Sequence, residues 1–353
     1  MLLQGVFPAI TTPFYPDGKV YLKKLEHNVE RYSRTPVSGM VVLGSTGEAV
    51  MLADQERREV LKTAMDSAAP SKVLIAGTGC ESAIETLRLG EYVAELGYDV
   101  VLVRTPNYYR TQMQPANILA FYRTIADRSA LPVLIYNIPQ CTGYDIPVEI
   151  VVQLAEHPNI IGIKESGGDV EKVRKMVACT RHVKRQATVT ETFDAVTSRM
   201  IKSAAGNAGG ELVAIAATPG ATKPSSAAIT VTGGIKTRPK EAGFTVLAGS
   251  AHQMEASLQA GAAGGILALA SPAPTACYEI FTAWKEGDFP LARAKQDAIA
   301  NASRRIVSEL GVPAIKYAMD LNGYYGGPPR LPLLPLTSDL KVEVERLMAD
   351  IRN

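Results

Sequence analysis

The feature that most constrains the fold is an alternation of short β-branched runs with amphipathic stretches. Eight runs have the composition of buried strands, at residues 6–14, 39–48, 72–79, 99–106, 132–139, 159–166, 243–251 and 262–270. Between the early runs, stretches such as 53–68 and 83–97 repeat apolar residues at three- and four-residue spacing, which is typical of amphipathic helices. Because each run is apolar enough to be covered by helices on its outer face, the eight units predict an α/β fold, a (β/α)8 TIM barrel.

The spacing of these units also predicts how the chain is divided. We expect a barrel over residues 1–272 and a helical region over 273–353, whose helix-like segments are 274–285, 290–309, 312–321 and one from 337. One connection breaks the rhythm, because about sixty residues separate the helix ending near Arg181 from the strand starting at Gly243, where ~2–6 residues are usual. We therefore predict an insertion at about 183–241, between helix 6 and strand 7.

The insertion joins a helix to the following strand, so it should emerge at the N-terminal face of the barrel, opposite the catalytic face. Its composition, rich in Ala, Thr, Gly and Ser, fits either a poorly ordered loop or a small added subdomain. We expect a structural, assembly or regulatory role, with an inert insertion as the alternative. Its glycines do not form a GxGxxG motif between a strand and a helix, so no nucleotide site is predicted there.

Composition narrows the class of protein. The 353 residues are 46% hydrophobic and 20% charged, with a net charge of +2 and no basic block, which argues against disorder and nucleic-acid binding. The first sixteen residues lack a basic n-region and are interrupted by prolines, so we predict neither a signal peptide nor a membrane span. The cysteines, Cys80, Cys141, Cys179 and Cys277, are far apart and form no CxxC pair. We expect a cytoplasmic protein with reduced thiols, no metal site and no cofactor.

Lys164 stands at the end of the buried run NIIGIKES, residues 159–166. It is either a lysine that extends to solvent or a buried amine, whose apolar surroundings favour the neutral, nucleophilic form. Since neighbours in a strand point to opposite faces, Ser166 should share the inward face with Lys164, and Glu165 should point towards the helices.

Other strand ends carry polar residues that could converge on the same pocket. Tyr136 ends LPVLIYNIP and is either a proton-transfer group beside the lysine or a core tyrosine. The turn Gly44-Ser45-Thr46 offers backbone N–H groups and hydroxyls to an anion, although such turns are common. Tyr108 and Tyr109 could equally serve packing or an interface.

Together, GSTGE (44–48), TPNYY (105–109), YNIPxxTG (136–143) and GIKES (162–166) resemble the dihydrodipicolinate synthase and N-acetylneuraminate lyase superfamily of class I, Schiff-base aldolases. The resemblance covers 5–181 and 243–350. It implies that Lys164 forms the imine with a 2-oxo acid and that Tyr136 is the acid/base, in a relay with Ser45 and with Tyr108 of a neighbouring subunit. It further implies a dimer or tetramer, and a substrate pocket formed by Gly44, Thr46, Ser166, Gly249, Ser250 and Ile266.

One departure bears on the substrate. Where dihydrodipicolinate synthases usually carry an arginine two residues after the proline of YNxP, this chain has Cys141, and a neutral thiol cannot bind a carboxylate as a guanidinium does. Other stretches, such as HPNIIGIKESGGDV (157–170) and GYYGGPPRLPL (323–333), resemble 4-hydroxy-2-oxoglutarate aldolase, which releases pyruvate and glyoxylate. We hypothesise that this is the reaction and that Arg110 attracts the second carboxylate. The alternatives are dihydrodipicolinate synthase, a 2-keto-3-deoxy sugar acid aldolase, and a catalytically silent barrel used for binding.

Overall fold

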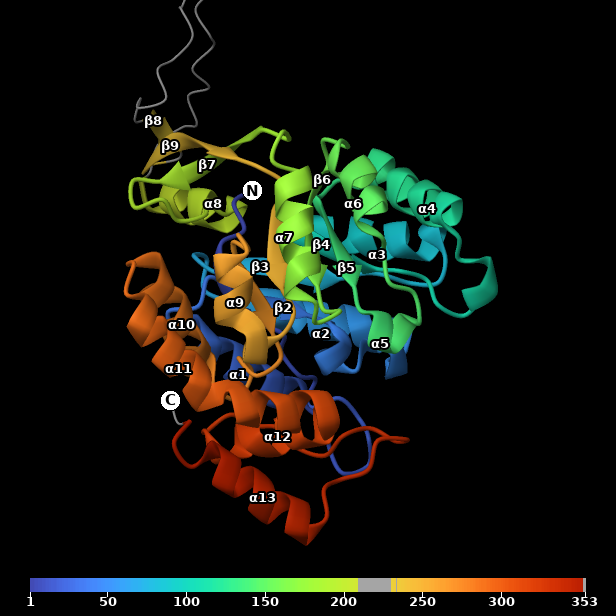
Figure 1. Cartoon of the computed structure of the whole chain (residues 1–353), viewed down its shortest axis with the longest axis vertical. Helices are drawn as coiled ribbons and strands as arrows, with labels where there is room; N and C mark the ends of the chain where they lie inside the picture. The colour runs from blue at the N-terminus through green and yellow to red at the C-terminus, as the bar shows by residue number, and fades with distance from the viewer. Residues whose placement is uncertain (209–229, 233, 352–353) are drawn as a thin grey trace, which may run out of the picture.

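The computed structural model describes residues 1–208, 230–232 and 234–351. Eight parallel strands form one sheet in the order β1-β11-β10-β6-β5-β4-β3-β2 (Figure 1). Their bounds are β1 Gly5–Pro8, β2 Gly39–Val42, β3 Val73–Gly77, β4 Val100–Arg104, β5 Val133–Asn137, β6 Ile160–Glu165, β10 Thr245–Ala248 and β11 Gly264–Leu267. A parallel bridge between Ala9 and Val41 joins the two edges. The predicted TIM barrel is confirmed.

Burial on both faces of the sheet explains why its strands are almost continuously apolar. One set of side chains fills the barrel interior, including Phe7, Val73, Leu102, Tyr136 and Ile266. The other set packs outwards against the surrounding helices. These helices are α1 Leu22–Ser33, α2 Asp54–Ser67, α3 Ala83–Leu96, α4 Pro115–Arg128, α6 Val148–Ala155, α7 Val170–Cys179, α9 Met254–Gln259 and α10 Pro274–Lys285.

Several strands are shorter than the apolar runs that predict them. The run 39–48 is a strand only to Val42, after which Ser45–Gly47 forms a 3-10 turn, η1. The turn ends at Glu48, which has the left-handed conformation with φ 54°. Such a conformation is rare outside glycine and stops the extended chain. The polar motif therefore lies on a turn above the strand and not within it.

The described part of the insertion folds as a small subdomain. Strands β7 Arg185–Thr190, β9 Ile235–Ala242 and β8 Thr230–Thr232 form an antiparallel sheet in the order β7-β9-β8, beside helix α8 Ser198–Ala208 (Figure 1). Thr197 donates a hydrogen bond to Pro70 O at 2.5 Å, and Arg185 donates one to His157 O at 2.8 Å. Because both acceptors precede barrel strands, the insertion lies on the N-terminal face, as predicted. The sequence between α8 and β8 falls outside the described residues.

The C-terminal helices lie at the other end of the barrel (Figure 1). They are α11 Phe289–Ala302, α12 Val312–Leu321 and α13 Ser338–Met348, which follow α10. The predicted helix 290–309 is regular only as far as Ala302 and continues as the π-helix η5 Ser303–Glu309. Thr11, which follows β1, donates a hydrogen bond to Met319 Sδ on α12 at 3.2 Å. Helix α12 thus packs over the carboxyl ends of the strands.

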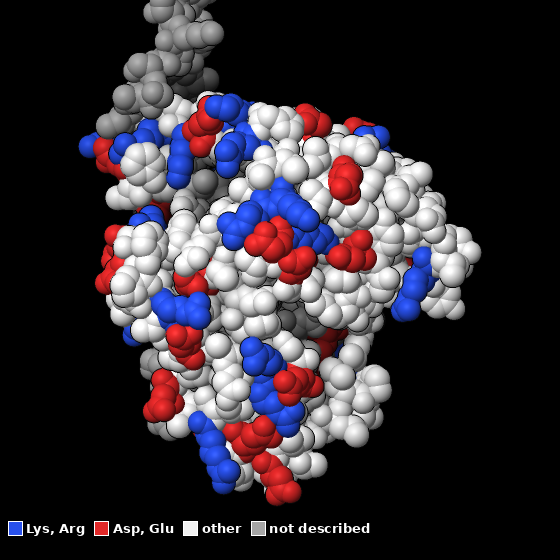
Figure 2. Space-filling view, in the orientation of Figure 1, with Lys and Arg blue, Asp and Glu red and all other residues white. Residues whose placement is uncertain are grey.

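Charged residues of both signs are interspersed on the face shown in Figure 2. Along single helices of the described chain, oppositely charged residues form ion pairs, as Arg58 does with Asp54 at 2.8 Å and Arg88 with Glu85 at 2.6 Å. Such exposed pairs contribute little to stability. None of the helices in the described ranges has the length and hydropathy needed to cross a membrane.

Candidate active site

Lys164 and Tyr136 lie side by side at the carboxyl ends of β6 and β5. The two residues are partners in the register of these adjacent strands. Both side chains are buried, with 4% and 5% exposure, and Lys164 Nζ lies 4.1 Å from the centre of the Tyr136 ring. Parallel pairing of two strands that each end in a polar residue is what brings the amine and the phenol together.

A third group comes from the turn after β2. Ser45 Oγ lies 3.3 Å from Tyr136 Oη, so either hydroxyl can donate a hydrogen bond to the other. The turn is fixed to the barrel because Thr12 Oγ1 donates a hydrogen bond to Gly47 O at 2.7 Å. Gly44 and Thr46 are buried beside Ser45. The lysine, the tyrosine and this turn therefore form one cluster.

A buried ion pair supports the turn from behind. Glu48 Oε1 lies 2.5 Å from Lys316 Nζ on α12, and neither side chain is exposed. Glu48 Oε2 accepts a hydrogen bond from Arg330 N at 2.8 Å, while Lys316 donates one to Pro328 O at 3.0 Å. Burial lowers the pKa of the Lys316 ammonium, and the Glu48 carboxylate opposes that shift. The C-terminal helices thereby hold the turn in place.

Glu165 points away from the cluster, towards the helices, as the strand alternation predicts. Its oxygens accept hydrogen bonds from Asn137 Nδ2 at 3.0 and 2.9 Å, and Lys172 Nζ on α7 lies 3.4 Å away. Burial raises the pKa of the Glu165 carboxyl, and the Lys172 ammonium opposes this effect. This network fixes β5 against β6 directly behind Tyr136 and Lys164.

The remaining predicted pocket residues follow β6 and β10 or lie on β11. Ser166 Oγ is buried and has no hydrogen-bond partner among the described residues. A Cβ atom at Gly249 would lie 1.9 Å from Ser166 Oγ, so only glycine permits the approach of these loops. Ser250 Oγ lies 2.8 Å from His252 Nδ1, and Ile266 on β11 is fully buried.

A cavity of about 680 Å³, within the range of small-molecule sites, opens beside Tyr136 and the Ser45 turn, and Lys164 lies behind Tyr136 and outside its lining. Its lining includes Gly44, Ser45, Tyr136 and Cys141. It also includes Arg104, which is paired with Tyr136 in the register of β4 and β5. The Arg104 guanidinium donates a hydrogen bond to Glu81 at 2.9 Å. Arg57 on α2 lines it as well, and its buried Nε has no partner among the described residues.

Sequence reasoning missed both arginines. Arg104 is a charged residue at the end of an apolar strand, which is the same signal that singles out Lys164. Arg57 lies inside the polar helix stretch QERREV, where its sequence neighbours are also charged, so nothing in the sequence distinguishes it.

The structure places Tyr108, Tyr109 and Arg110 at the surface. Tyr108 is 79% and Tyr109 67% exposed, and their rings meet edge to face at 5.3 Å. No hydrogen bond links Tyr108 to Ser45 or Tyr136 within the described chain. The Arg110 guanidinium lies beside Gly143, which ends the short helix α5 Pro139–Thr142 that carries Cys141.

The sequence profile of the Dihydrodipicolinate synthetase family matches residues 2–223 and 210–351. The chain belongs to this family. Members of the family are Schiff-base-forming lyases, and this chain is an enzyme of that class. The family assignment thus disfavours the catalytically silent barrel.

The relatives match either almost the whole chain or about half of it. The 4-hydroxy-tetrahydrodipicolinate synthase of Natronomonas pharaonis is 29% identical over 98% of this chain and 97% of its own length. That of Xanthomonas campestris is 39% identical over 50% of this chain and 58% of its own. A solved structure of the dihydrodipicolinate synthase from Acinetobacter baumannii, complexed with pyruvate, has 26% identity and a TM-score of 0.77 over 99% of both chains. The specific likeness to 4-hydroxy-2-oxoglutarate aldolase is not confirmed by these comparisons.

Proposed function

We propose that this enzyme makes and breaks the C3–C4 bond of a 2-oxo acid through an imine on Lys164. The observation that carries the proposal is the buried Lys164–Tyr136 pair, with Ser45 in hydrogen-bond reach of the phenol. The relative from Acinetobacter baumannii, whose crystal structure holds pyruvate, supports a pyruvate unit as the common part of the substrate. A nucleophilic amine, a proton-transfer group and an anion-binding turn are the groups that such chemistry requires.

In the proposed cleavage, the neutral Lys164 amine attacks C2 of the substrate. Tyr136 donates its proton to the departing hydroxyl group, so loss of water leaves a protonated imine and a Tyr136 phenolate. The phenolate takes the proton of the C4 hydroxyl, the C3–C4 bond breaks, and the aldehyde leaves. The bonding electrons pass to the imine, which becomes an enamine. Protonation of C3 and addition of water then release pyruvate and the free amine. The turn at Gly44, Ser45 and Thr46 holds the carboxylate, which orients C2 towards Lys164.

We infer that Tyr108 acts in the site of a neighbouring subunit, in a homodimer or homotetramer in the cytoplasm. The exposure of Tyr108 and Tyr109 supports this inference, because exposed aromatic pairs are typical of protein interfaces. Glu81 accepts hydrogen bonds from the backbone N–H groups of Asn107 and Tyr108, both at 2.9 Å. The segment is therefore held in a defined conformation although its rings face outwards.

We propose 4-hydroxy-2-oxoglutarate as the substrate, with a 2-keto-3-deoxy sugar acid as a related possibility to be screened beside it. Cys141 lines the cavity at the position where the synthases usually carry an arginine. Desolvation raises the pKa of its thiol, so the side chain is neutral at pH 7. We propose that Arg110, which lies beside Gly143 at the end of the short helix that carries Cys141, binds the second carboxylate of the substrate.

Condensation of pyruvate with aspartate semialdehyde is the second candidate. It is favoured by the curated relatives that match nearly the whole chain and are named 4-hydroxy-tetrahydrodipicolinate synthase. Turnover of both reactions by the same preparation separates the candidates. Faster cleavage of 4-hydroxy-2-oxoglutarate would support the aldolase function. Condensation of pyruvate with aspartate semialdehyde at a competitive rate would support the synthase function instead.

Replacing Cys141 by arginine is expected to raise kcat/KM for aspartate semialdehyde by about 10–10²-fold, because a charge-assisted hydrogen bond contributes about 1.5–3 kcal/mol. Steady-state kinetics of the condensation would measure the change. Cys141→Met is the matched control, since it fills the position without adding charge. If arginine and methionine give the same kcat/KM, Cys141 does not decide the substrate.

A further inference from the structure

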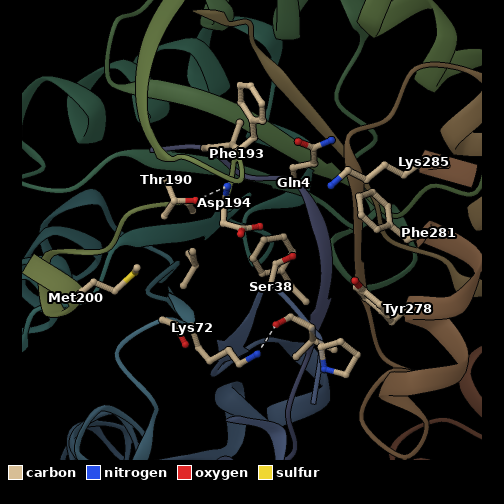
Figure 3. A pocket seen from close by; sticks show the side chains of 17 residues that line it. Gln4, Ser38, Lys72, Thr190, Phe193, Asp194, Met200, Tyr278, Phe281 and Lys285 are labelled. Atoms are coloured by element: carbon tan, nitrogen blue, oxygen red, sulfur yellow. Dashed lines mark hydrogen bonds between the residues drawn. The ribbon is translucent and has the colours of Figure 1, made fainter. Parts of the chain in front are cut away.

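A second cavity lies between the insertion and the N-terminal face of the barrel, at the opposite end from Lys164. Its volume is about 280 Å³. It is lined by barrel residues such as Phe7 and Lys72, by Tyr278, Phe281 and Lys285 of α10, and by Thr190, Phe193, Asp194 and Met200 of the insertion (Figure 3). The site therefore exists only because the insertion covers this end of the barrel.

Aromatic side chains form one part of the wall, beside polar side chains such as Gln4, Ser38 and Thr190. Phe7 belongs to the barrel-interior cluster, and Phe281 stands on the helix that packs against β1. Phe193 lies at the edge of the cavity, and its exposed ring points away from the space (Figure 3) and is covered by the Arg238 guanidinium at 4.2 Å from the centre. The aromatic part of the wall, Phe7, Tyr278 and Phe281, suits an apolar or aromatic group of a few carbon atoms.

Two side chains of opposite charge, Asp194 and Lys285, also line the cavity, and they do not form an ion pair with each other. Asp194 and Lys285 extend into the space from the insertion and from α10 (Figure 3). Both residues are exposed. Lys285 forms no ion pair with the described residues, and among these residues the Asp194 carboxylate accepts a hydrogen bond from the Thr192 hydroxyl at 2.7 Å. An anion and a cation thus remain available on two sides of one cavity whose wall is partly aromatic.

Lys72, the other cation in the lining, is already engaged. Its ammonium donates hydrogen bonds to Thr35 O at 2.6 Å and to Val37 O at 2.8 Å. Lys72 directly precedes β3, and these hydrogen bonds fix it to the loop before β2. Lys285 is the lysine that can meet a ligand.

The turn that presents Asp194 is strongly constrained. Phe193 has φ 67°, which is strained for a residue with a large side chain. Three hydrogen bonds hold the turn: Thr190 N to Asp194 O at 2.9 Å, Phe193 N to Thr190 O at 3.0 Å, and Asp194 N to Thr190 Oγ1 at 3.0 Å. Strain of this kind persists where the surrounding structure fixes it, and it often marks a ligand-binding segment.

We propose that this cavity binds a small zwitterion, an α-amino acid with an apolar or aromatic side chain. Asp194 receives the ammonium group, Lys285 receives the carboxylate, and the side chain of the ligand packs against Phe7 and Phe281. Each end of the ligand thereby meets a charge that has no ion-pair partner among the described residues. The proposal does not depend on which reaction Lys164 performs.

Isothermal titration of the full-length protein with L-phenylalanine and L-leucine tests the proposal. We expect at least one of them to bind, and we expect phenethylamine and 3-phenylpropionate, which each keep one charge, to bind at least about tenfold more weakly. Asp194→Asn and Lys285→Met should each weaken binding by about the same factor. Asp339→Asn and Lys175→Met, which change exposed charges outside the cavity lining, should bind as the wild type does.

Trapping of pyruvate on the variants serves as the folding check, because the cavity and Lys164 lie at opposite ends of the barrel. All four variants should trap pyruvate to the wild-type extent. The proposal is overturned if neither amino acid binds the wild-type protein at about 10 mM, a concentration well above the millimolar limit of weak specific binding. It is equally overturned if the singly charged analogues bind as tightly, or if Asp194→Asn and Lys285→Met leave binding unchanged.

Discussion

Replacing Tyr136 by phenylalanine is expected to lower kcat by about 10²–10⁴-fold, the usual contribution of a positioned acid or base. The phenol is the hydroxyl group beside Lys164, and it is the partner of Ser45 at 3.3 Å. Its loss removes the group that takes the C4 hydroxyl proton but leaves the lysine amine and the ring in place. We therefore expect the imine with pyruvate still to form, more slowly, while C3–C4 cleavage almost stops. Steady-state cleavage and borohydride trapping of the same preparation would measure the two steps.

Tyr98→Phe is the matched control for this variant. Tyr98 is also buried, but its hydroxyl donates a hydrogen bond to Leu61 O at 2.8 Å, between the helices and away from the cluster. It should lose about 1 kcal/mol of stability and keep its kcat. A Tyr136→Phe enzyme as active as Tyr98→Phe would contradict the assignment of Tyr136 as the acid/base.

Replacing Lys316 by methionine is expected to destabilise the protein by about 3–5 kcal/mol, because it leaves the buried Glu48 carboxylate without its cation. The side chains of Lys316 and Glu48 are both fully buried, with 2.5 Å between Nζ and Oε1, and the carboxylate also accepts a hydrogen bond from Arg330 N at 2.8 Å. The urea midpoint at one fixed protein concentration would measure the loss. Because Glu48 ends the turn at Ser45 and Thr46, the KM for the 2-oxo acid should rise as well.

The double variant Glu48→Gln with Lys316→Met removes both charges and is the control for the pair. We expect it to recover much of the lost stability, since paired removal of a buried ion pair is often close to neutral. The Lys316 ammonium also lies over the Phe14 ring, 4.3 Å from its centre. If the double variant is as unstable as Lys316→Met alone, the loss of stability comes from this lost packing and not from the unpaired Glu48 carboxylate.

The barrel and the core of its site could be predicted because both depend on local patterns. Eight apolar runs define eight strands, and a parallel barrel places every strand end on one face, so Lys164 and Tyr136 could be expected to meet. The end of β2 could not be predicted, because the number of apolar residues in the run 39–48 does not reveal the left-handed backbone conformation of Glu48.

The support of the site and the second cavity depend on contacts between distant parts of the chain. In the sequence, Glu48 and Lys316 cannot be distinguished from charged surface residues. Only the packing of α12 over the barrel shows that their side chains are buried together. Likewise, the polar alternation of β7 gives no hint that the turn after this strand presents Asp194 at the same cavity as Lys285. Such pairings are decided by tertiary packing, which composition and periodicity do not contain.

Peptide mass spectrometry after incubation with pyruvate and borohydride tests the central claim most directly. The account predicts one reduced pyruvyl adduct per chain, located on Lys164 and absent from a Lys164→Met variant that still folds. An adduct confined to a different lysine, or no adduct on the folded wild-type protein, would contradict the assignment of Lys164 as the imine-forming residue.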